Sequence, residues 1–150
     1  MHLTLRFLGE VDAARDLELR GVWRDAVQGF PPLRFRLGGA GVFPGAARPR
    51  VLWIGVREDP PGGRIEGLAR ALESAARGAG FPPEERPFHP HLTLARARRE
   101  MRATAPREPI PELQSVVECA AVLLLRSELA PAGARYTLLE AYPLAGGGRE

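Results

Sequence analysis

The tetrapeptide His-Leu-Thr-Leu occurs twice in this chain of 150 residues, at residues 2–5 and again at residues 91–94. The chain contains only three histidines and four threonines, so two of each fall within the repeated segment. Residues this rare seldom recur in the same order by chance, and each copy lies near the start of a predicted strand. The repeat therefore indicates an internal duplication of one structural unit.

The spacing within the tetrapeptide has a geometric meaning. Residues i and i+2 of a strand point to the same face. His2 and Thr4 therefore share a face in the first copy, as His91 and Thr93 do in the second, while the leucines point to the core. Two such strands, related by a pseudo-twofold axis, would line one groove with two imidazoles and two hydroxyls.

This set of groups suits phosphoester hydrolysis. A neutral imidazole can accept a proton from the attacking nucleophile, and a protonated one can donate a proton to the leaving oxygen. Histidine reaches both states near neutral pH, and threonine hydroxyls can hydrogen-bond the phosphate oxygens. Arg6 shares the face of His2 and Thr4, so it is a candidate for a charge-assisted contact with phosphate.

A metal site is the weaker interpretation of the same histidines. His89 lies close to His91 in sequence, but Pro90 separates them and no third ligand stands at a useful spacing. His89 shares the strand face of His91, so it either supports that residue or lies at the surface. The single cysteine, Cys119, excludes an internal disulfide and a cysteine-based zinc cluster.

Composition and charge narrow the class of protein further. All 21 basic residues are arginine and the net charge is +3, which allows a polyanionic partner without requiring one. Five arginines fall between residues 96 and 107, as either a solvated loop or a basic lip beside a phosphate site. No apolar run is long enough to cross a bilayer and no secretory signal is present, so we expect a cytoplasmic protein without a membrane partner.

Hydrophobic periodicity predicts an α+β domain with mostly antiparallel sheet. The expected order is β-α-β-β-α-β-β-β in a single domain spanning residues 1–150. Residues 38–49, rich in glycine and proline, are expected to form a connection. The predicted strands are 2–8, 33–37, 51–56, 88–96, 116–126 and 135–142, and the predicted helices are 12–28 and 65–79.

At the repeated motifs the chain resembles a known family, the 2H phosphoesterases. The closest subgroup is the bacterial RNA 2′,3′-cyclic phosphodiesterase, historically called 2′-5′ RNA ligase. The resemblance covers nearly the whole chain. It is carried by residues 2–11, 41–44, 48–56, 86–96 and 123–129.

The resemblance implies a two-lobed, pseudo-twofold fold with two main helices and antiparallel sheets around a central groove. It also implies cofactor-free, metal-independent opening of a terminal RNA 2′,3′-cyclic phosphate to a 2′-phosphate. By resemblance, His91 is the general base, His2 is the general acid, and Thr4 and Thr93 hold phosphate oxygens. Arg96 matches a substrate-contacting arginine, but simple alternation places it on the face opposite His91, so that role requires a β-bulge or a strand end.

The chain departs from the family pattern at its start. Family members carry a strand and a helix ahead of the first motif, whereas here only Met1 precedes His2. We therefore expect an N-terminally truncated domain whose true start lies upstream. The partner is expected to be RNA with a 2′,3′-cyclic phosphate end, bound by a monomer. The alternatives are a 2′-5′ RNA ligase, a 2′-5′ oligonucleotide phosphodiesterase, or an inactive RNA-binding remnant that uses the arginines of residues 96–107.

Overall fold

The computed structural model describes residues 2–97, 108, 110–130 and 133–145. Its two helices and six strands follow one another as α1 (Ala13–Val27), β1 (Leu33–Phe43), β2 (Val51–Glu58), α2 (Arg64–Gly78), β3 (His91–Arg96), β4 (Val117–Cys119), β5 (Ala121–Ala130) and β6 (Gly133–Pro143). One sheet has the order β3-β2-β1-β4, and β5 and β6 form a hairpin of their own. The paired strands are antiparallel throughout these two sheets, which confirms the predicted α+β class.

Both predicted helices are confirmed. α1 begins after Asp12, whose side chain accepts a hydrogen bond of 2.9 Å from the backbone N–H of Arg15. Its buried residues are spaced four apart, at Leu19, Trp23 and Val27, and so form one stripe along the helix. α2 buries a similar stripe, consisting of Ile65, Leu68, Ala69, Leu72 and Ala76.

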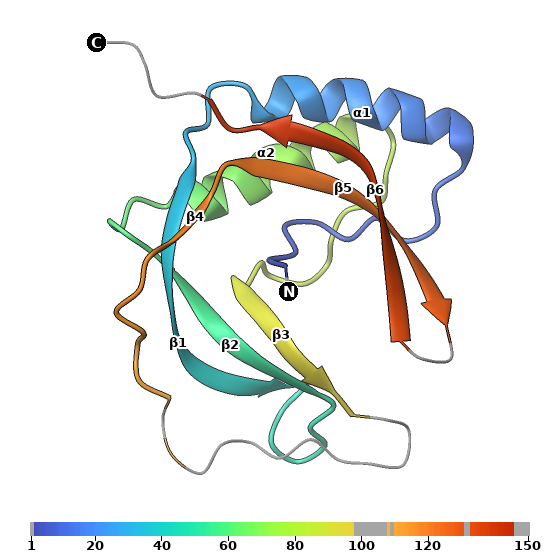
Figure 1. Ribbon diagram of the computed structural model, residues 1–150. Coiled ribbons are helices and arrows are strands. Elements are labelled where there is room, and N and C mark those ends of the chain that lie inside the picture. Colours follow the sequence, from blue (N-terminus) through green and yellow to red (C-terminus); the bar gives the residue numbers. More distant parts are fainter. Residues whose placement is uncertain (1, 98–107, 109, 131–132, 146–150) are drawn as a thin grey trace.

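The core lies between the helices and the sheets. Trp23 of α1 is 3% exposed, and its indole Nε1 donates a hydrogen bond of 3.1 Å to the carbonyl of Leu72 in α2. Strand residues complete the same cluster from the other side, among them Phe35, Ile54 and Val122. Figure 1 shows both helices on the same side of the molecule, with the four-stranded sheet and the hairpin diverging below them.

The predicted connection over residues 38–49 is wrong in its first half, because β1 continues to Phe43. Gly38 and Gly41 serve close packing rather than a turn. A Cβ atom on Gly41 would lie 2.2 Å from Cζ2 of Trp53, and one on Gly38 would lie 2.6 Å from Cα of Glu112. Only a residue without a side chain lets these neighbours approach so closely.

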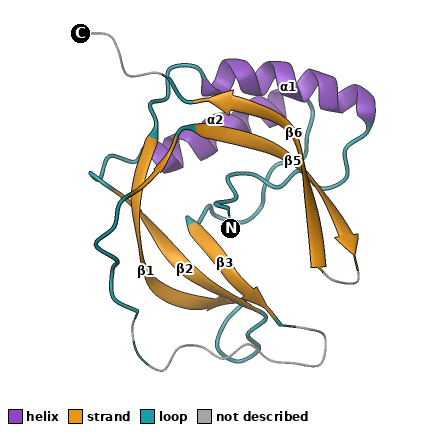
Figure 2. Ribbon diagram, viewed as in Figure 1, coloured by secondary structure: helices purple, strands orange, loops and turns teal. Residues whose placement is uncertain are grey.

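The predicted strand over residues 2–8 is also wrong. The segment forms one isolated antiparallel bridge, between Leu3 and Leu92, and no strand of its own. Its alternating pattern is typical of a strand, but a strand also needs a neighbour along its whole length. Figure 2 shows the segment as a loop that passes between the four-stranded sheet and the hairpin.

The predicted strand over residues 116–126 is interrupted at Ala120. The residues before this point belong to β4, which pairs with β1, and the residues after it belong to β5, which pairs with β6. Ala120 therefore lies where the chain leaves one sheet for the other. The predicted strands over 51–56, 88–96 and 135–142 correspond to β2, β3 and β6 with shifted ends.

Candidate active site

The two copies of the tetrapeptide meet through their backbones. Leu3 and Leu92 form an antiparallel bridge, so the residues on either side of them are opposite one another in the reversed order. This pairing sets His2 opposite Thr93 and Thr4 opposite His91. Directly opposed residues of an antiparallel pair point to the same face; the predicted common face of the two histidines and two threonines is consistent with this register and stays a prediction.

The orientation of His91 is fixed by the residue two positions before it. Nδ1 of His91 lies 2.6 Å from the carbonyl oxygen of His89. A carbonyl can only accept a hydrogen bond, so Nδ1 carries the proton and donates it. The neutral ring then keeps its lone pair on Nε2, which is the form required of a general base. His89 thus supports His91 through its backbone.

The surroundings of His2 disfavour its protonated form. Partial burial lowers its pKa, and the positive charges of the chain's N-terminal ammonium and of Arg96 lower it further. Its ring also meets the ring of Tyr136 in β6 edge to face, with 4.9 Å between centroids. An anion bound beside His2 would offset the neighbouring positive charges and favour its protonated form.

Arg96 reaches the face of His91 through a β-bulge. Trp53 of β2 pairs with Thr93, while the preceding residue, Leu52, pairs with Ala95. Leu94 is therefore an extra residue in β3, and after it the alternation resumes with Arg96 on the face of His91 and Thr93. The bulge that the sequence argument required is present, and the charge of Arg96 acts on His2. Its contact with substrate stays a prediction.

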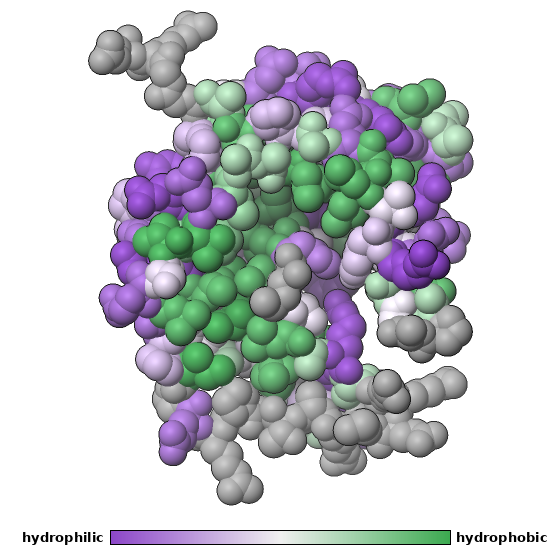
Figure 3. Space-filling view, in the orientation of Figure 1, coloured by the Kyte–Doolittle hydropathy of each residue, from purple (hydrophilic) through white to green (hydrophobic). Residues whose placement is uncertain are grey.

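Aromatic side chains line the same face of the four-stranded sheet. The rings of Phe43 and Trp53 stack with 5.2 Å between their centroids, and Phe43 meets the ring of His91 edge to face at 5.1 Å. Trp53 meets the ring of His89 at 4.7 Å. Its indole Nε1 is buried and has no hydrogen-bond partner in the described part of the chain. Figure 3 shows apolar side chains gathered over β1, β2 and β3.

Sequence reasoning missed Trp53, because residues 51–56 read as a wholly apolar, buried strand. Trp53 is instead partly exposed; it pairs with Thr93 and shares its strand face with Gly55, which pairs with His91. Burial distinguishes the two faces of β2, since Ile54 and Val56 are buried on the other face, but the wholly apolar sequence of residues 51–56 carries no signal of this difference.

Arg6 lies apart from the face of the imidazoles, among acidic and carbonyl oxygens. Its side chain is 6% exposed and forms ion pairs with Glu73 and Glu84. Its predicted contact with phosphate stays a prediction, and phosphate would have to compete with these protein partners.

Other candidate features lie elsewhere or outside the described residues. Most of the arginine-rich run, residues 98–107, falls outside them. Across the described ranges no group of three or more His, Cys, Asp or Glu side chains is placed to hold a metal ion. Neither described helix is both long and apolar enough to cross a membrane.

Known proteins are similar to this chain in sequence and in structure. An RNA 2′,3′-cyclic phosphodiesterase of Methanothermobacter thermautotrophicus is 38% identical over 148 residues, covering 96% of this chain and 78% of the relative. The Escherichia coli protein of the same name is 38% identical over 144 residues, covering 96% and 76%.

Solved structures agree with the sequence relatives. A crystal structure of a Thermus thermophilus protein matches with a TM-score of 0.79 and 32% identity, covering 98% of this chain and 79% of that one. Escherichia coli LigT complexed with 3′-AMP matches with a TM-score of 0.77 and 32% identity, covering 95% and 76%. A sequence model described as the 2′-5′ RNA ligase superfamily matches residues 1–129. This chain therefore belongs to the 2′-5′ RNA ligase superfamily.

Proposed function

We propose that this protein is an RNA 2′,3′-cyclic phosphodiesterase. It hydrolyses terminal 2′,3′-cyclic phosphates of RNA to 2′-phosphomonoesters, using two histidines and no metal ion. The observation that carries the proposal is the antiparallel pairing of Leu3 with Leu92, which brings the two copies of the tetrapeptide side by side. The curated relatives with this activity in their names support it.

The proposed reaction divides its two proton transfers between the imidazoles. Nε2 of His91 accepts a proton from water as the water oxygen attacks phosphorus. The bond between phosphorus and the 3′ oxygen breaks, and His2 donates its proton to that oxygen. The product carries a 2′-phosphate and a free 3′ hydroxyl. His91 then loses the gained proton to solvent and His2 takes one up, which restores both groups for the next cycle.

Two kinds of neighbour assist these steps. The hydroxyls of Thr4 and Thr93 donate hydrogen bonds to the non-bridging phosphate oxygens and hold phosphorus in line with water. The guanidinium of Arg96 adds positive charge on the same face. The negative charge of bound phosphate counteracts the positive charges that lower the pKa of His2. Substrate therefore favours the protonated form of His2, which the general acid requires.

The terminal nucleoside packs on the aromatic side of the site. Phe43 and Trp53 offer a stacked pair of rings next to His91, and aromatic rings are the usual partners of unpaired RNA bases.

The proposal also includes the oligomeric state and the cellular location of the protein. Both motifs come from one chain and pair within it, so the active unit is a monomer, which size-exclusion chromatography with light scattering would check. We place it in the cytoplasm, together with its RNA substrate.

The decisive assay uses an oligoribonucleotide ending in a 2′,3′-cyclic phosphate, with chelator in excess. The expected product is the 2′-phosphate, identified by chromatography against 2′- and 3′-phosphate standards. Turnover that disappears with chelator and returns with a divalent cation contradicts the proposal, as does full activity in His91→Ala. Joined RNA ends would instead identify a 2′-5′ ligase.

A further inference from the structure

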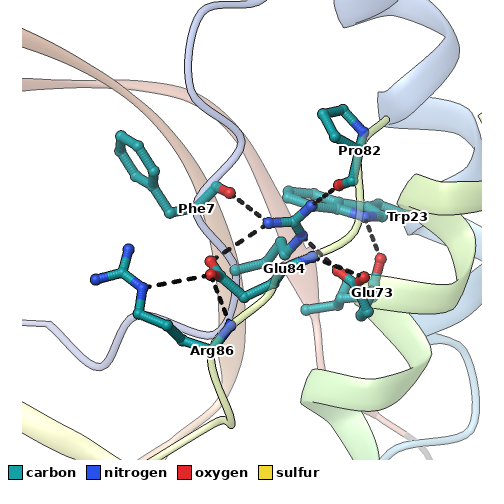
Figure 4. Close-up of polar contacts among 8 residues, drawn as sticks. Phe7, Trp23, Glu73, Pro82, Glu84 and Arg86 are labelled. Atoms are coloured by element: carbon teal, nitrogen blue, oxygen red, sulfur yellow. Dashed lines mark hydrogen bonds and ion pairs between the residues drawn. The ribbon is translucent and has the colours of Figure 1, made fainter. Parts of the chain in front are cut away.

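The guanidinium of Arg6 contacts its own segment at Phe7, α2 at Glu73, and the segment of Pro82 and Glu84; Figure 4 labels these partners. Nε lies 2.6 Å from Oε2 of Glu73 in α2. Nη2 donates to the carbonyl of Pro82 at 2.5 Å, and Nη1 donates to the carbonyl of Phe7 at 2.6 Å. Nη1 also lies 3.5 Å from Oε2 of Glu84. Each of the three nitrogens therefore has a partner within the protein.

The contacts are those of a cation held by its surroundings. Arg6 is 6% exposed, and Nε and the Glu73 Oε2 atom that faces it are buried. Their contact is close but is not aligned as a hydrogen bond, and neither atom has a hydrogen-bond partner among the described residues. Each charge therefore depends on the other for compensation, because an unpaired charge away from water is unfavourable. Glu73 also accepts a hydrogen bond of 3.1 Å from the backbone N–H of Glu84.

Arg6 and its partners lie in the segments of chain that adjoin the two motifs. Arg6 follows Thr4 by two residues, so it anchors the first motif. Pro82 and Glu84 belong to the segment that runs from Phe81 to His91, so they anchor the approach to the second. α2, which contributes Glu73, supports both. One guanidinium thus joins the segment that follows the first motif to the segment that leads to the second motif and to α2.

This anchor adds a polar contact to a first motif that is otherwise held by apolar packing, since Leu3 and Leu5 pack against the core. Residues 2–8 form no strand, and the backbone bridge between Leu3 and Leu92 is isolated. A single bridge fixes the backbone of this segment at one place only, and a second fixed point restricts its position further. The Arg6 cluster supplies such a point four residues after His2.

We propose that Arg6, through Glu73 and Glu84, is a positioning residue that sets the distance between the imidazoles of His2 and His91. It does so without contacting substrate. The inference rests on the proposed function and goes beyond it, by assigning to Arg6 a role in alignment. The competing assignment, a direct contact between Arg6 and phosphate, makes a different prediction about substrate binding.

The test compares Arg6→Gln with a matched control, Arg36→Gln. Arg36 contacts Asp59 through Nε at 3.1 Å and Nη2 at 3.0 Å, and it donates to the carbonyl of Gln114 at 2.5 Å. It is therefore also a guanidinium held by a carboxylate and a carbonyl, but it touches neither motif. Arg6→Lys keeps the positive charge but loses the planar guanidinium, whose N–H groups donate in fixed directions. Glu84→Gln is a milder change at a partly exposed partner of Arg6. It tests the same contact if the Arg6 variants fail to fold.

We expect kcat of Arg6→Gln to fall by about 100-fold, the scale of a misplacement near 1 Å, with KM unchanged. Arg6→Lys and Glu84→Gln should show intermediate losses, and Arg36→Gln should keep the wild-type kcat. The pH profile separates alignment from lost stability. A smaller folded fraction lowers the whole profile, whereas a displaced His2 returns toward its ordinary pKa and moves one limb.

A second readout does not depend on turnover. The imidazole NMR signals of His2 and His91 should both shift in Arg6→Gln and stay in place in Arg36→Gln. Unchanged imidazole signals together with a wild-type kcat in the folded Arg6 and Glu84 variants would overturn the inference. A raised KM at unchanged kcat would overturn it in favour of direct phosphate contact. If the wild-type protein leaves cyclic phosphate intact, the proposed function fails, and the imidazole signals still decide the positioning role.

Discussion

Leu3 and Leu92 pair in antiparallel fashion, although 89 residues separate them in sequence. The pairing relates the two copies of His-Leu-Thr-Leu by a local twofold axis, with the leucines at its centre. In this register the histidine position of each copy lies opposite the threonine position of the other. The two copies differ in their surroundings, since His91 is oriented by a backbone carbonyl and His2 lies near positive charge. One repeated motif thus supplies two chemically different groups.

His91→Ala should lower kcat by about 100- to 10,000-fold, the usual contribution of a general base. The folded state should be retained, because His91 is only partly buried and its hydrogen bond goes to a neighbouring carbonyl. Circular dichroism checks the fold, and cyclic phosphate hydrolysis at saturating substrate gives kcat. Added imidazole should restore part of the activity. Turnover at the wild-type rate without rescue would remove His91 from the mechanism.

Thr4→Val and Thr93→Val should produce similar losses, since the two threonines occupy equivalent places in the repeat. Valine keeps the shape of the side chain and removes the hydroxyl donor. Loss of one donor to a phosphate oxygen is expected to cost about 100- to 1,000-fold in kcat. Thr137→Val, on an exposed position of β6, is the matched control and should leave kcat unchanged. Equal effects in all three variants would contradict the predicted role of the hydroxyls.

Arg96→Gln should raise the pKa of His2, because it removes one of the positive charges that lower it. Proton NMR titration of the imidazole measures this directly. Burial remains the largest cause, so His2 should still titrate below the ordinary value of a histidine. A His2 signal that titrates identically in both proteins would show that the guanidinium does not act on that ring.

The lowered pKa of His2 also predicts the direction in which the free energy of unfolding changes with pH. The unfolded chain has the ordinary histidine pKa and binds the His2 proton more readily than the folded chain does. The contribution of His2 to the free energy of unfolding therefore falls as the pH is lowered through the ordinary histidine pKa, roughly 6.5. Urea unfolding of wild-type protein and His2→Gln between pH 8 and pH 5, values chosen to span about one unit or more on either side of that pKa, should show a smaller acid-induced loss in the variant. An equal loss in both would contradict the lowered pKa.

Gly41→Ala should displace Trp53, since the added methyl would lie 2.2 Å from its Cζ2 atom. We expect a lower free energy of unfolding by about 1–3 kcal/mol, as for overpacked interiors, and a change in tryptophan fluorescence. Gly21→Ala is the control, because a Cβ there meets nothing within 4 Å and Gly21 lies inside α1. It should raise the free energy of unfolding by about 0.5–1 kcal/mol. Matching stabilisation in both variants would show that Trp53 does not pack on Gly41.

The parts of the fold that could be predicted from the sequence are those determined by residues close to one another in the chain. α1 is set by the Asp12 cap and by its own buried stripe, so its pattern needs no information from the rest of the chain. The motif residues could be found for a similar reason, because their repetition is visible without a structure. The bulge at Leu94 was also accessible, since Arg96 could reach the site only through such an irregularity.

The remaining features depend on neighbours far along the chain. The strand beyond Gly38 exists because β2 pairs with it and the ring of Trp53 lies over Gly41. Residues 2–8 carry a strand pattern without a ladder to join, and periodicity alone cannot reveal a missing neighbour. The surroundings of Arg6 were equally hidden, because its acidic partners lie some seventy residues away.

The single bridge between the motifs also has a consequence for the order of folding. Its ends are separated by both helices and the first two strands, so closing it before they form would carry the loop entropy of nearly the whole intervening chain. The helical pair and the β1–β2 hairpin can form from closer contacts. We expect catalytic competence to appear in the last phase of refolding, after most helical signal has returned. During synthesis the site cannot exist until the second motif has left the ribosome.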